Sequence, residues 1–299
     1  MMRLRIAATL GAAALLAAAC SGDRATADPG TPAVVVTYPV LGAVVADLVG
    51  DRAAVTILMG NGVDPHDWSP SARDIERVEK ADLVVANGLN LEEGLGEPLA
   101  EVEKRGVVVF RATDHVTVRR RAAGEAGAGS GDGGDPHFWV DPLAMRDVVL
   151  ALAPVLGSVG VDVADRAPAL ATRLADLDAA TRATLAVVPE ARRLLVTGHE
   201  SMGYFARRYG FKLVGVIIPS LSSQAGISAA DLAALKKAIQ ENQVKVIFTE
   251  LGTPPSVAKA IGAETGARVV ELNTHALPAD GSYFTFMRNM ADTISNALK

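Results

Sequence analysis

Residues 33–37 read Ala-Val-Val-Val-Thr, a short β-branched run that predicts a buried strand. The run opens a regular alternation of elements that continues to residue 110. We expect helices over 41–49, 73–81 and 99–104, and further strands over 54–58, 83–86 and 107–110. Strands that alternate with helices are typical of parallel βαβ units, so this part of the chain predicts an α/β domain with a parallel sheet.

The alternation begins again after Pro189. It predicts strands over 194–197, 213–218, 244–249 and 268–272, and helices over 202–209, 231–240, 256–265 and 283–298. Between the two series, residues 162–187 carry leucines at helical spacing with charged residues between them. A helix of that length would span about 39 Å. We therefore expect two Rossmann-like α/β domains, at 33–161 and 188–299, joined by one long linking helix at 162–187.

Composition limits the classes of protein that this chain can belong to. Hydrophobic residues make up 49% of the 299 residues and charged residues 21%, which excludes a disordered or fibrous chain. The net charge of −5 argues against nucleic acid as the main partner, because phosphate binding needs a basic surface. A single cysteine excludes an intrachain disulfide framework and a zinc site of the CxxC kind.

The N-terminus has the pattern of a targeting segment. Arg3 and Arg5 precede an apolar run over 6–19 that is too short to span a membrane but suits a secretory signal. Small residues before Cys20 resemble a bacterial lipobox, although Leu16 stands four residues before the cysteine where the usual spacing is three. We expect a signal peptide over 1–19, a lipidated Cys20 and a flexible tether over 20–32. The alternative is an ordinary signal peptide with Cys20 incidental.

These features predict an exported protein that is anchored by lipid on the outer side of the cell membrane, at the cell surface or in the periplasm. A second unusual stretch lies at 122–134, with six glycines in thirteen residues. This composition is typical of a flexible loop.

Five histidines are the main candidates for chemistry. His66, His137 and His199 lie in loops that follow predicted strands or adjoin turn residues. Ligands of parallel α/β folds bind at the carboxyl ends of strands, where such loops converge. The three residues are far apart in sequence, so only the fold could bring them together. For His115 and His275 we expect a surface or structural role.

The segments around these histidines resemble one family throughout. They are Asp64-Pro65-His66-Asp67-Trp68, Asp135-Pro136-His137-Phe138-Trp139 and Thr197-Gly198-His199. The family is the metal-binding component of bacterial ABC uptake transporters for zinc and manganese, the ZnuA/TroA-like proteins. The resemblance extends to residues 218–222 and 247–250 and to the helix that begins at Ser282-Tyr283, and so covers nearly the whole mature chain.

The resemblance implies a metal site in the cleft between the two domains, with His66, His137 and His199 as ligands. It places the fourth ligand, an acid before the last helix, at Asp280. Glu200 is the second candidate carboxylate. Glu250 either orients a histidine or is a capping or surface acid. Many relatives have a His-rich loop where this chain has 122–134, which contains no histidine.

The function implied is capture of Zn²⁺, with Mn²⁺ as the alternative, and delivery to a membrane permease whose ATPase is a separate chain. Three imidazoles and one carboxylate suit a tetrahedral zinc site without an open position. Such a site binds and carries an ion and does not activate water. We expect a monomer.

Enzyme motifs are absent from the sequence. Ser201 stands three residues after Gly198, whereas a nucleophile elbow needs two. Neither a P-loop nor an H-E-x-x-H pattern occurs. We therefore expect no enzymatic activity. An exported metal-dependent hydrolase and an adhesin or scaffold protein remain as alternatives.

Overall fold

The N-terminal half of the protein contains a parallel sheet with the strand order β2-β1-β3-β4. The structure is a computed structural model that describes residues 30–120 and 134–299. The strands of this sheet are β1 (Ala33–Val36), β2 (Ala54–Ile57), β3 (Leu83–Ala86) and β4 (Val108–Arg111). Helices α1 (Pro39–Val49), α2 (Ala72–Glu79) and α3 (Gly96–Lys104) connect them. The central strands β1 and β3 are apolar and buried, as expected of a parallel sheet covered on both faces.

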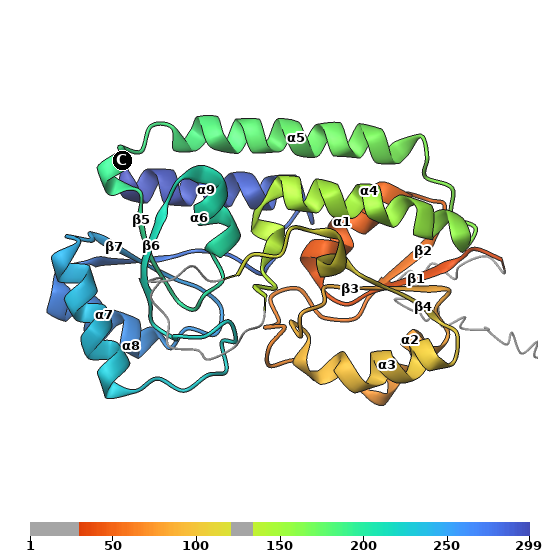
Figure 1. Cartoon of the computed structure of the whole chain (residues 1–299), viewed down its shortest axis with the longest axis horizontal. Coiled ribbons are helices and arrows are strands. Elements are labelled where there is room, and N and C mark those ends of the chain that lie inside the picture. The colour runs from red at the N-terminus through yellow and green to blue at the C-terminus, as the bar shows by residue number, and fades with distance from the viewer. Residues whose placement is uncertain (1–29, 121–133) are drawn as a thin grey trace, which may run out of the picture. The chain divides into compact units, whose positions relative to one another are not determined.

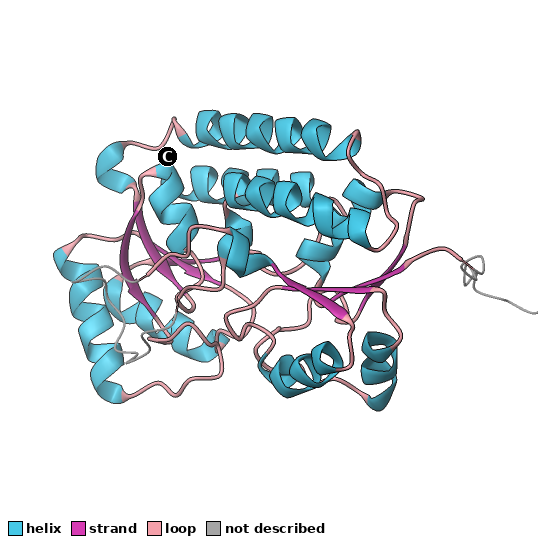
Figure 2. Ribbon diagram, turned by 45° about the vertical axis from the view of Figure 1, so that its right-hand side comes forward, coloured by secondary structure: helices cyan, strands magenta, loops and turns pink. Residues whose placement is uncertain are grey.

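The C-terminal half repeats this arrangement with two parallel strand pairs (Figure 1). Strand β5 (Leu194–Thr197) pairs with β6 (Lys212–Val216), and β7 (Val246–Thr249) pairs with β8 (Arg268–Glu271). The connecting helices are α6 (Gly203–Tyr209), α7 (Ala229–Glu241) and α8 (Pro255–Thr265). Strands β5 and β7 contact each other, which brings the two pairs together. Figure 2 shows the strands of both halves between layers of helices.

The predicted α/β class with parallel sheets is therefore confirmed, and the bounds of the elements nearly coincide with those expected. Capping explains several helix starts. Ser71 forms a capping box with Asp74 before α2, and Ser228 does so with Asp231 before α7. Short 3₁₀ turns also occur in the described residues, at η1 (Glu93–Leu95), η2 (Ala112–His115), η3 (Phe138–Val140) and η4 (Glu190–Arg192).

The long helix predicted over 162–187 is α5 (Arg166–Leu185), which packs against α4 (Pro142–Ser158) and α9 (Tyr283–Leu298) (Figure 1). Its 20 residues span about 30 Å. It begins later than expected because Asp162 accepts a hydrogen bond from the backbone of Ala164 and forms a turn there. The leucines that predicted the helix are buried, as their spacing required.

Helix α4 was not predicted. Its sequence is apolar around most of its circumference and contains Pro154, so it lacks the amphipathic period that identifies a surface helix. Asp141 caps its start by accepting hydrogen bonds from the backbone N–H groups of Leu143 and Ala144. The helix thus begins five residues after His137 and fixes the end of the segment that carries this residue.

One hydrophobic core extends through both halves. It contains Leu41 and Val85 from the N-terminal half, Leu174 of α5, and Phe248 and Phe286 from the C-terminal half. Residues Thr31–Lys299 accordingly form one compact unit. The domain bounds 33–161, 162–187 and 188–299 stay predictions.

Several predicted features fall where the structure gives no description. The signal peptide at 1–19, Cys20, nearly all of the tether and the glycine-rich loop except Gly134 lie outside the described residues. Among the helices within 30–120 and 134–299, none combines the length and the apolar character needed to cross a bilayer.

Candidate metal centre

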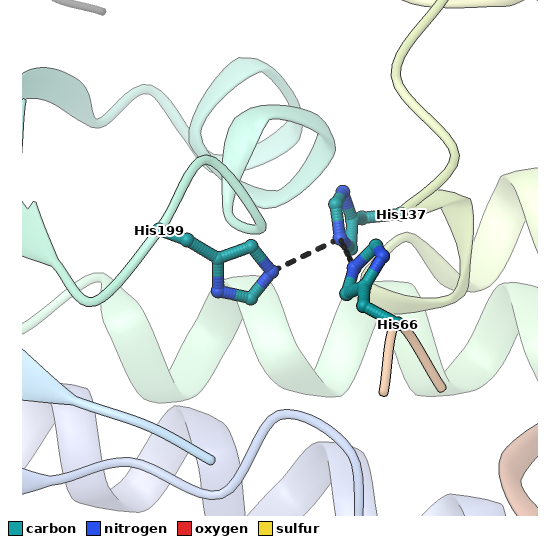
Figure 3. A group of neighbouring side chains, drawn as sticks. All are labelled: His66, His137 and His199. Atoms are coloured by element: carbon teal, nitrogen blue, oxygen red, sulfur yellow. Dashed lines mark hydrogen bonds between the residues drawn. The ribbon is translucent and has the colours of Figure 1, made fainter. Parts of the chain in front are cut away.

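Three of the four predicted ligand residues lie together. His66 follows β2, His137 immediately precedes η3, and His199 follows β5; their exposed fractions are 5%, 0% and 1%. Figure 3 shows that the three rings point toward one another. His137 Nε2 lies 3.3 Å from His66 Nε2 and 3.2 Å from His199 Nε2. In the described part of the chain, these residues form the one group of His, Cys, Asp and Glu side chains spaced to hold a metal ion.

Two of these histidines are positioned by the same local turn. The sequence Asp-Pro-His occurs at 64–66 and again at 135–137. In both copies the aspartate Oδ1 accepts the backbone N–H of the histidine, at 3.0 Å for Asp64 and 2.9 Å for Asp135. The proline fixes φ inside the turn, and the Asp side chain closes it. This repeated tripeptide is the sequence signal from which the turn could have been predicted.

His199 is positioned instead by a buried acid, Glu250, that directly follows strand β7. Its backbone N–H donates to Glu250 Oε1 at 3.0 Å, and its carbonyl accepts from Thr197 Oγ1 at 2.8 Å. Gly198 permits this approach, since a Cβ there would overlap Thr253 Oγ1 and crowd Glu250. Glu250 therefore orients His199, and its 7% exposure excludes the alternative of a surface acid.

Each of the three imidazoles has a carboxylate beside Nδ1. The distances are 2.9 Å from His137 to Asp135 Oδ1, 3.1 Å from His199 to Glu250 Oε1 and 3.5 Å from His66 to Glu93 Oε1. The first contact is a hydrogen bond. The other two lack its alignment and are electrostatic contacts. A carboxylate at Nδ1 favours the tautomer that carries its proton there, which leaves the Nε2 lone pair free for a metal.

Burial and neighbouring charges shift the pKa values of these groups. Burial, followed by the charge of His199, lowers the pKa of His66 to about 4, and burial also lowers that of His137 well below its usual value. Burial acts in the same direction on His199 and is the largest single effect, but the charge and hydrogen bond of Glu250 and the charges of Asp64 and Asp135 together outweigh it and raise the pKa. Burial would raise the pKa of Glu250, yet His199 and the hydrogen bonds it accepts hold that pKa near 2. His66 and His137 are thus neutral at neutral pH, the form that binds metal.

Asp280, the expected fourth ligand, does not join the cluster. It is exposed, and its carboxylate accepts hydrogen bonds from the Ser282 backbone at 3.0 Å and from Thr285 Oγ1 at 2.7 Å. These contacts place Asp280 at the start of α9, where an acid stabilises the helix. The expectation rested on the family resemblance, which gave only an acid before the last helix, and the local helix start determines where this carboxylate points.

Two other candidates also lie outside the cluster. His115 is exposed and stacks on Phe110, with 4.5 Å between the ring centroids. Glu200 is buried next to His199, and its backbone N–H donates to the carbonyl of Ser220. Neither side chain contributes to the group of converging ligand atoms in the described residues.

His275 lies beside the cluster, although sequence reasoning gave it a surface or structural role. Its ring centroid is 5.7 Å from that of His199 and 6.3 Å from that of His137, and the residue is only 4% exposed. Its Nε2 atom is buried without a hydrogen-bond partner among the described residues. Burial, followed by the charge of His199, lowers its pKa to about 4.

The hydrogen bonds of Thr274 settle which nitrogen of His275 carries the proton. The Thr274 hydroxyl donates its single hydrogen to Glu250 Oε2 at 2.7 Å. The same oxygen lies 2.7 Å from His275 Nδ1 and must therefore accept from it. The proton is on Nδ1, so the unpartnered Nε2 carries a free lone pair. Glu250 thus supports His199 directly and His275 through Thr274.

Buried imidazoles that converge between two parallel-sheet halves, with a carboxylate behind each ring, define an α/β protein built to hold a transition-metal ion. The chain belongs to the ZnuA family, zinc-uptake complex component A (periplasmic), whose family model matches residues 34–297.

Individual relatives agree with this assignment. The chain is 31% identical over 291 residues to the zinc-binding protein TroA of Treponema pallidum, covering 93% of this chain and 92% of that protein. It is 26% identical over 296 residues to the manganese-binding lipoprotein MntA of Halalkalibacterium halodurans, covering 95% of each. The solved structure of periplasmic zinc-binding TroA from T. pallidum matches with a TM-score of 0.76 at 28% identity, over 90% of this chain and 99% of that one.

Proposed function

We propose that this chain captures Zn²⁺ outside the cytoplasm and delivers it to an ABC-type uptake permease that is driven by a separate ATPase chain. The observation that carries the proposal is the spacing of the Nε2 atoms of His66, His137 and His199, at 3.3 and 3.2 Å. Tetrahedral zinc with bonds of 2.0–2.1 Å would separate its ligand nitrogens by about 3.3–3.4 Å. The imidazoles are therefore preorganised for zinc.

The proposed ligands are these three residues and His275. The free, buried Nε2 of His275 supports this choice, as do its ring contacts with His137 and His199. Asp280 is not proposed, because its carboxylate is already bonded at the start of α9. A set of four nitrogens favours zinc over manganese, which prefers oxygen ligands. Mn²⁺ is the alternative cargo and would require a carboxylate such as Glu200 to enter the site.

The protein is a binding protein and not an enzyme. A metal-dependent hydrolase needs an open metal position that water and substrate can reach. Here all four imidazoles are at least nine-tenths buried, which suits retention of an ion and not turnover.

The finer features of the proposal concern assembly and location. We propose a monomer that is exported and anchored through lipid on Cys20, a residue outside the described part of the chain. The net charge of −5 supports a partner other than nucleic acid.

The test is zinc binding by the purified chain and by four variants. We expect one zinc per chain, and X-ray absorption should show four nitrogen ligands. A metal that binds only the folded state stabilises it by about 4 kcal/mol at a thousandfold excess over Kd. His66→Ala, His199→Ala and His275→Ala should each lose most of the resulting rise in melting temperature, whereas Asp280→Ala should retain it. If His275→Ala keeps the full zinc-induced rise in melting temperature and Asp280→Ala loses it, the fourth ligand is Asp280, as the sequence predicted, and not His275.

A further inference from the structure

The loop that leads to His66 is held by the C-terminal half of the molecule. The side-chain amide of Asn61 donates to the carbonyl of Leu277 at 2.8 Å and accepts the backbone N–H of Leu277 at 2.7 Å. One amide thus makes both hydrogen bonds of a strand-like pair with one residue, 216 positions away in sequence. The turn that carries His66 is closed by Asp64 and does not involve these two hydrogen bonds. The Asn61–Leu277 pair therefore serves to join the two halves.

A second contact holds the same loop from another side. Ser223 Oγ donates to Asp64 Oδ2 at 2.6 Å, while Asp64 Oδ1 accepts the backbone N–H of His66. Gly252 lies against this carboxylate with φ +81°, and a Cβ there would be 2.7 Å from Asp64 Oδ2. The two oxygens of Asp64 therefore divide their roles. One forms the turn that carries His66, and the other reaches across to the C-terminal half.

A third contact reaches the acid behind His66. Ser222 Oγ donates to Glu93 Oε1 at 2.7 Å, and this is the oxygen that lies 3.5 Å from His66 Nδ1. The C-terminal half thus contacts both the loop of His66 and the carboxylate that faces its ring.

The partner loop carries the proposed ligand His275. Asn273 organises it, since its Oδ1 accepts the backbone N–H of Ala276 at 2.8 Å and its Nδ2 donates to the Ala276 carbonyl at 2.6 Å. The Asn61–Leu277 pair therefore ties a loop with one ligand to a loop with another. The imidazoles of the site are buried, so separation of these two loops would move His66 and His275 apart and open a route for the ion.

We propose that Asn61, with Ser223 and Asp64, forms a clasp whose opening sets the rate of metal release. The inference rests on the proposed function and adds a positioning role for residues that do not touch the ion. Asn61 is exposed, so the clasp lies where a docking partner can reach it. Two neutral hydrogen bonds together change an equilibrium by about tenfold. The clasp is thus strong enough to retain an ion and weak enough to be opened.

The first test measures zinc dissociation from the loaded full chain after mixing with excess fluorescent chelator. Asn61→Ala should release zinc about tenfold faster than wild type. Asn61→Asp keeps the acceptor for Leu277 N–H and loses the donor, so its rate should be intermediate. Ser223→Ala should also accelerate release. Asn296→Ala, an exposed asparagine near the end of α9, is the matched control and should release at the wild-type rate.

A second test locks the clasp. A Cβ at Gly62 would lie 4.0 Å from the Cβ of Ala276, within the range that a disulfide bridges. The double variant Gly62→Cys/Ala276→Cys, in a Cys20→Ser background, should form this bond on oxidation after loading with zinc. The oxidised protein should then release zinc at least about tenfold more slowly than the same protein after reduction.

Equal release rates for Asn61→Ala, Asn296→Ala and wild type, or equal rates for the oxidised and reduced double variant, would overturn the clasp. A failure of the proposed function would give a different experimental result. The wild-type chain would then show no zinc-induced thermal shift, and the clasp would have no cargo to retain.

Discussion

The Nδ1 atom of His137 lies 2.9 Å from Oδ1 of Asp135, and the same oxygen accepts the backbone N–H of His137. One carboxylate oxygen thus fixes both the turn and the tautomer of a proposed ligand. Burial raises the pKa of Asp135 to about 7, although the His137 backbone and Arg119 oppose this shift. Burial therefore destabilises the ionised form of Asp135. A residue that only closed a turn would not need to be a buried acid.

The first prediction is that Asp135→Asn weakens zinc binding by about 10- to 100-fold, the usual effect of losing the acid behind a metal-bound histidine. The turn should persist, because an asparagine Oδ1 can still accept the His137 N–H. The melting temperature of the metal-free protein should therefore change little. Zinc titration in competition with a chelator measures the effect, and the exposed Asp292→Asn on α9 is the control. Equal affinity of the two variants would exclude this role for Asp135.

The second prediction concerns pH. Protons compete with zinc only at ligands that titrate in the range examined. His199 has a raised pKa and takes up a proton first as the pH falls, whereas His66 does so only near pH 4. The apparent Kd should therefore rise by about tenfold per pH unit between pH 6 and 5, which corresponds to one proton. Competition titrations across this range test the slope, and a slope of three protons would show that all the imidazoles titrate together.

A third prediction concerns the stability of the folded protein. Arg208 of α6 donates from Nε to Asp141 Oδ1 at 2.8 Å, and Asp141 is 1% exposed. Arg208→Ala would leave this carboxylate with the N-terminal N–H groups of α4 as partners. Because the Arg208 side chain is 28% exposed, water compensates part of the loss. We expect the free energy of unfolding to fall by about 2 kcal/mol.

Urea denaturation of the metal-free protein measures this change. The neighbouring Arg207 is exposed and lies 5.0 Å over the Tyr204 ring, so Arg207→Ala should cost less than about 1 kcal/mol. A double variant with Asp141→Asn should lose less than the sum of the two single changes, because both remove the same ion pair. Strict additivity would mean that the two side chains act independently.

The fourth prediction tests the anchor. If Cys20 carries lipid, Cys20→Ala should move the protein from the membrane fraction to the soluble fraction of the cell. Zinc affinity and melting temperature should remain those of the wild type, because the proposed ligands all lie within the compact unit Thr31–Lys299. Retention of the variant in the membrane fraction would contradict lipid attachment at this residue.

How much the sequence could predict depended on whether the signal was local. Short β-branched runs such as 33–37 identified the strands, because a buried parallel strand needs an apolar run and little else. Helix α4 was not predicted because it is apolar on most sides and its sequence shows no clear helical periodicity of hydrophobic residues. The family resemblance, and not the spacing of the residues, brought His66, His137 and His199 together.

The sequence could not distinguish Asp280 from His275 as the fourth residue of the site. Both precede α9 within a short segment, and an acid was the expected ligand type there. The choice depended on which residue faces the histidine cluster and which one starts the helix. Hydrogen bonds from Ser282 and Thr285 hold Asp280 at the helix start, and the contact of Thr274 with His275 Nδ1 leaves the Nε2 atom of this histidine unpartnered beside the cluster. Such contacts depend on three-dimensional positions that no local pattern in this segment encodes.

The pairing of Arg119 with Asp135 has a consequence for protein engineering. The backbone N–H of Asp135 donates to the carbonyl of Arg119 at 2.8 Å, and Tyr204 Oη accepts the backbone N–H of Arg119 and donates to the carbonyl of Asp135. The two residues that bracket 120–134 are thus fastened to each other and to α6. A reporter domain inserted between Arg119 and Asp135 would be attached at the same two hydrogen-bonded residues as the natural segment. The position of His137 should therefore be retained. The segment between Arg119 and Asp135 thus offers a place to insert a fluorescent reporter close to His137, a residue of the proposed zinc site.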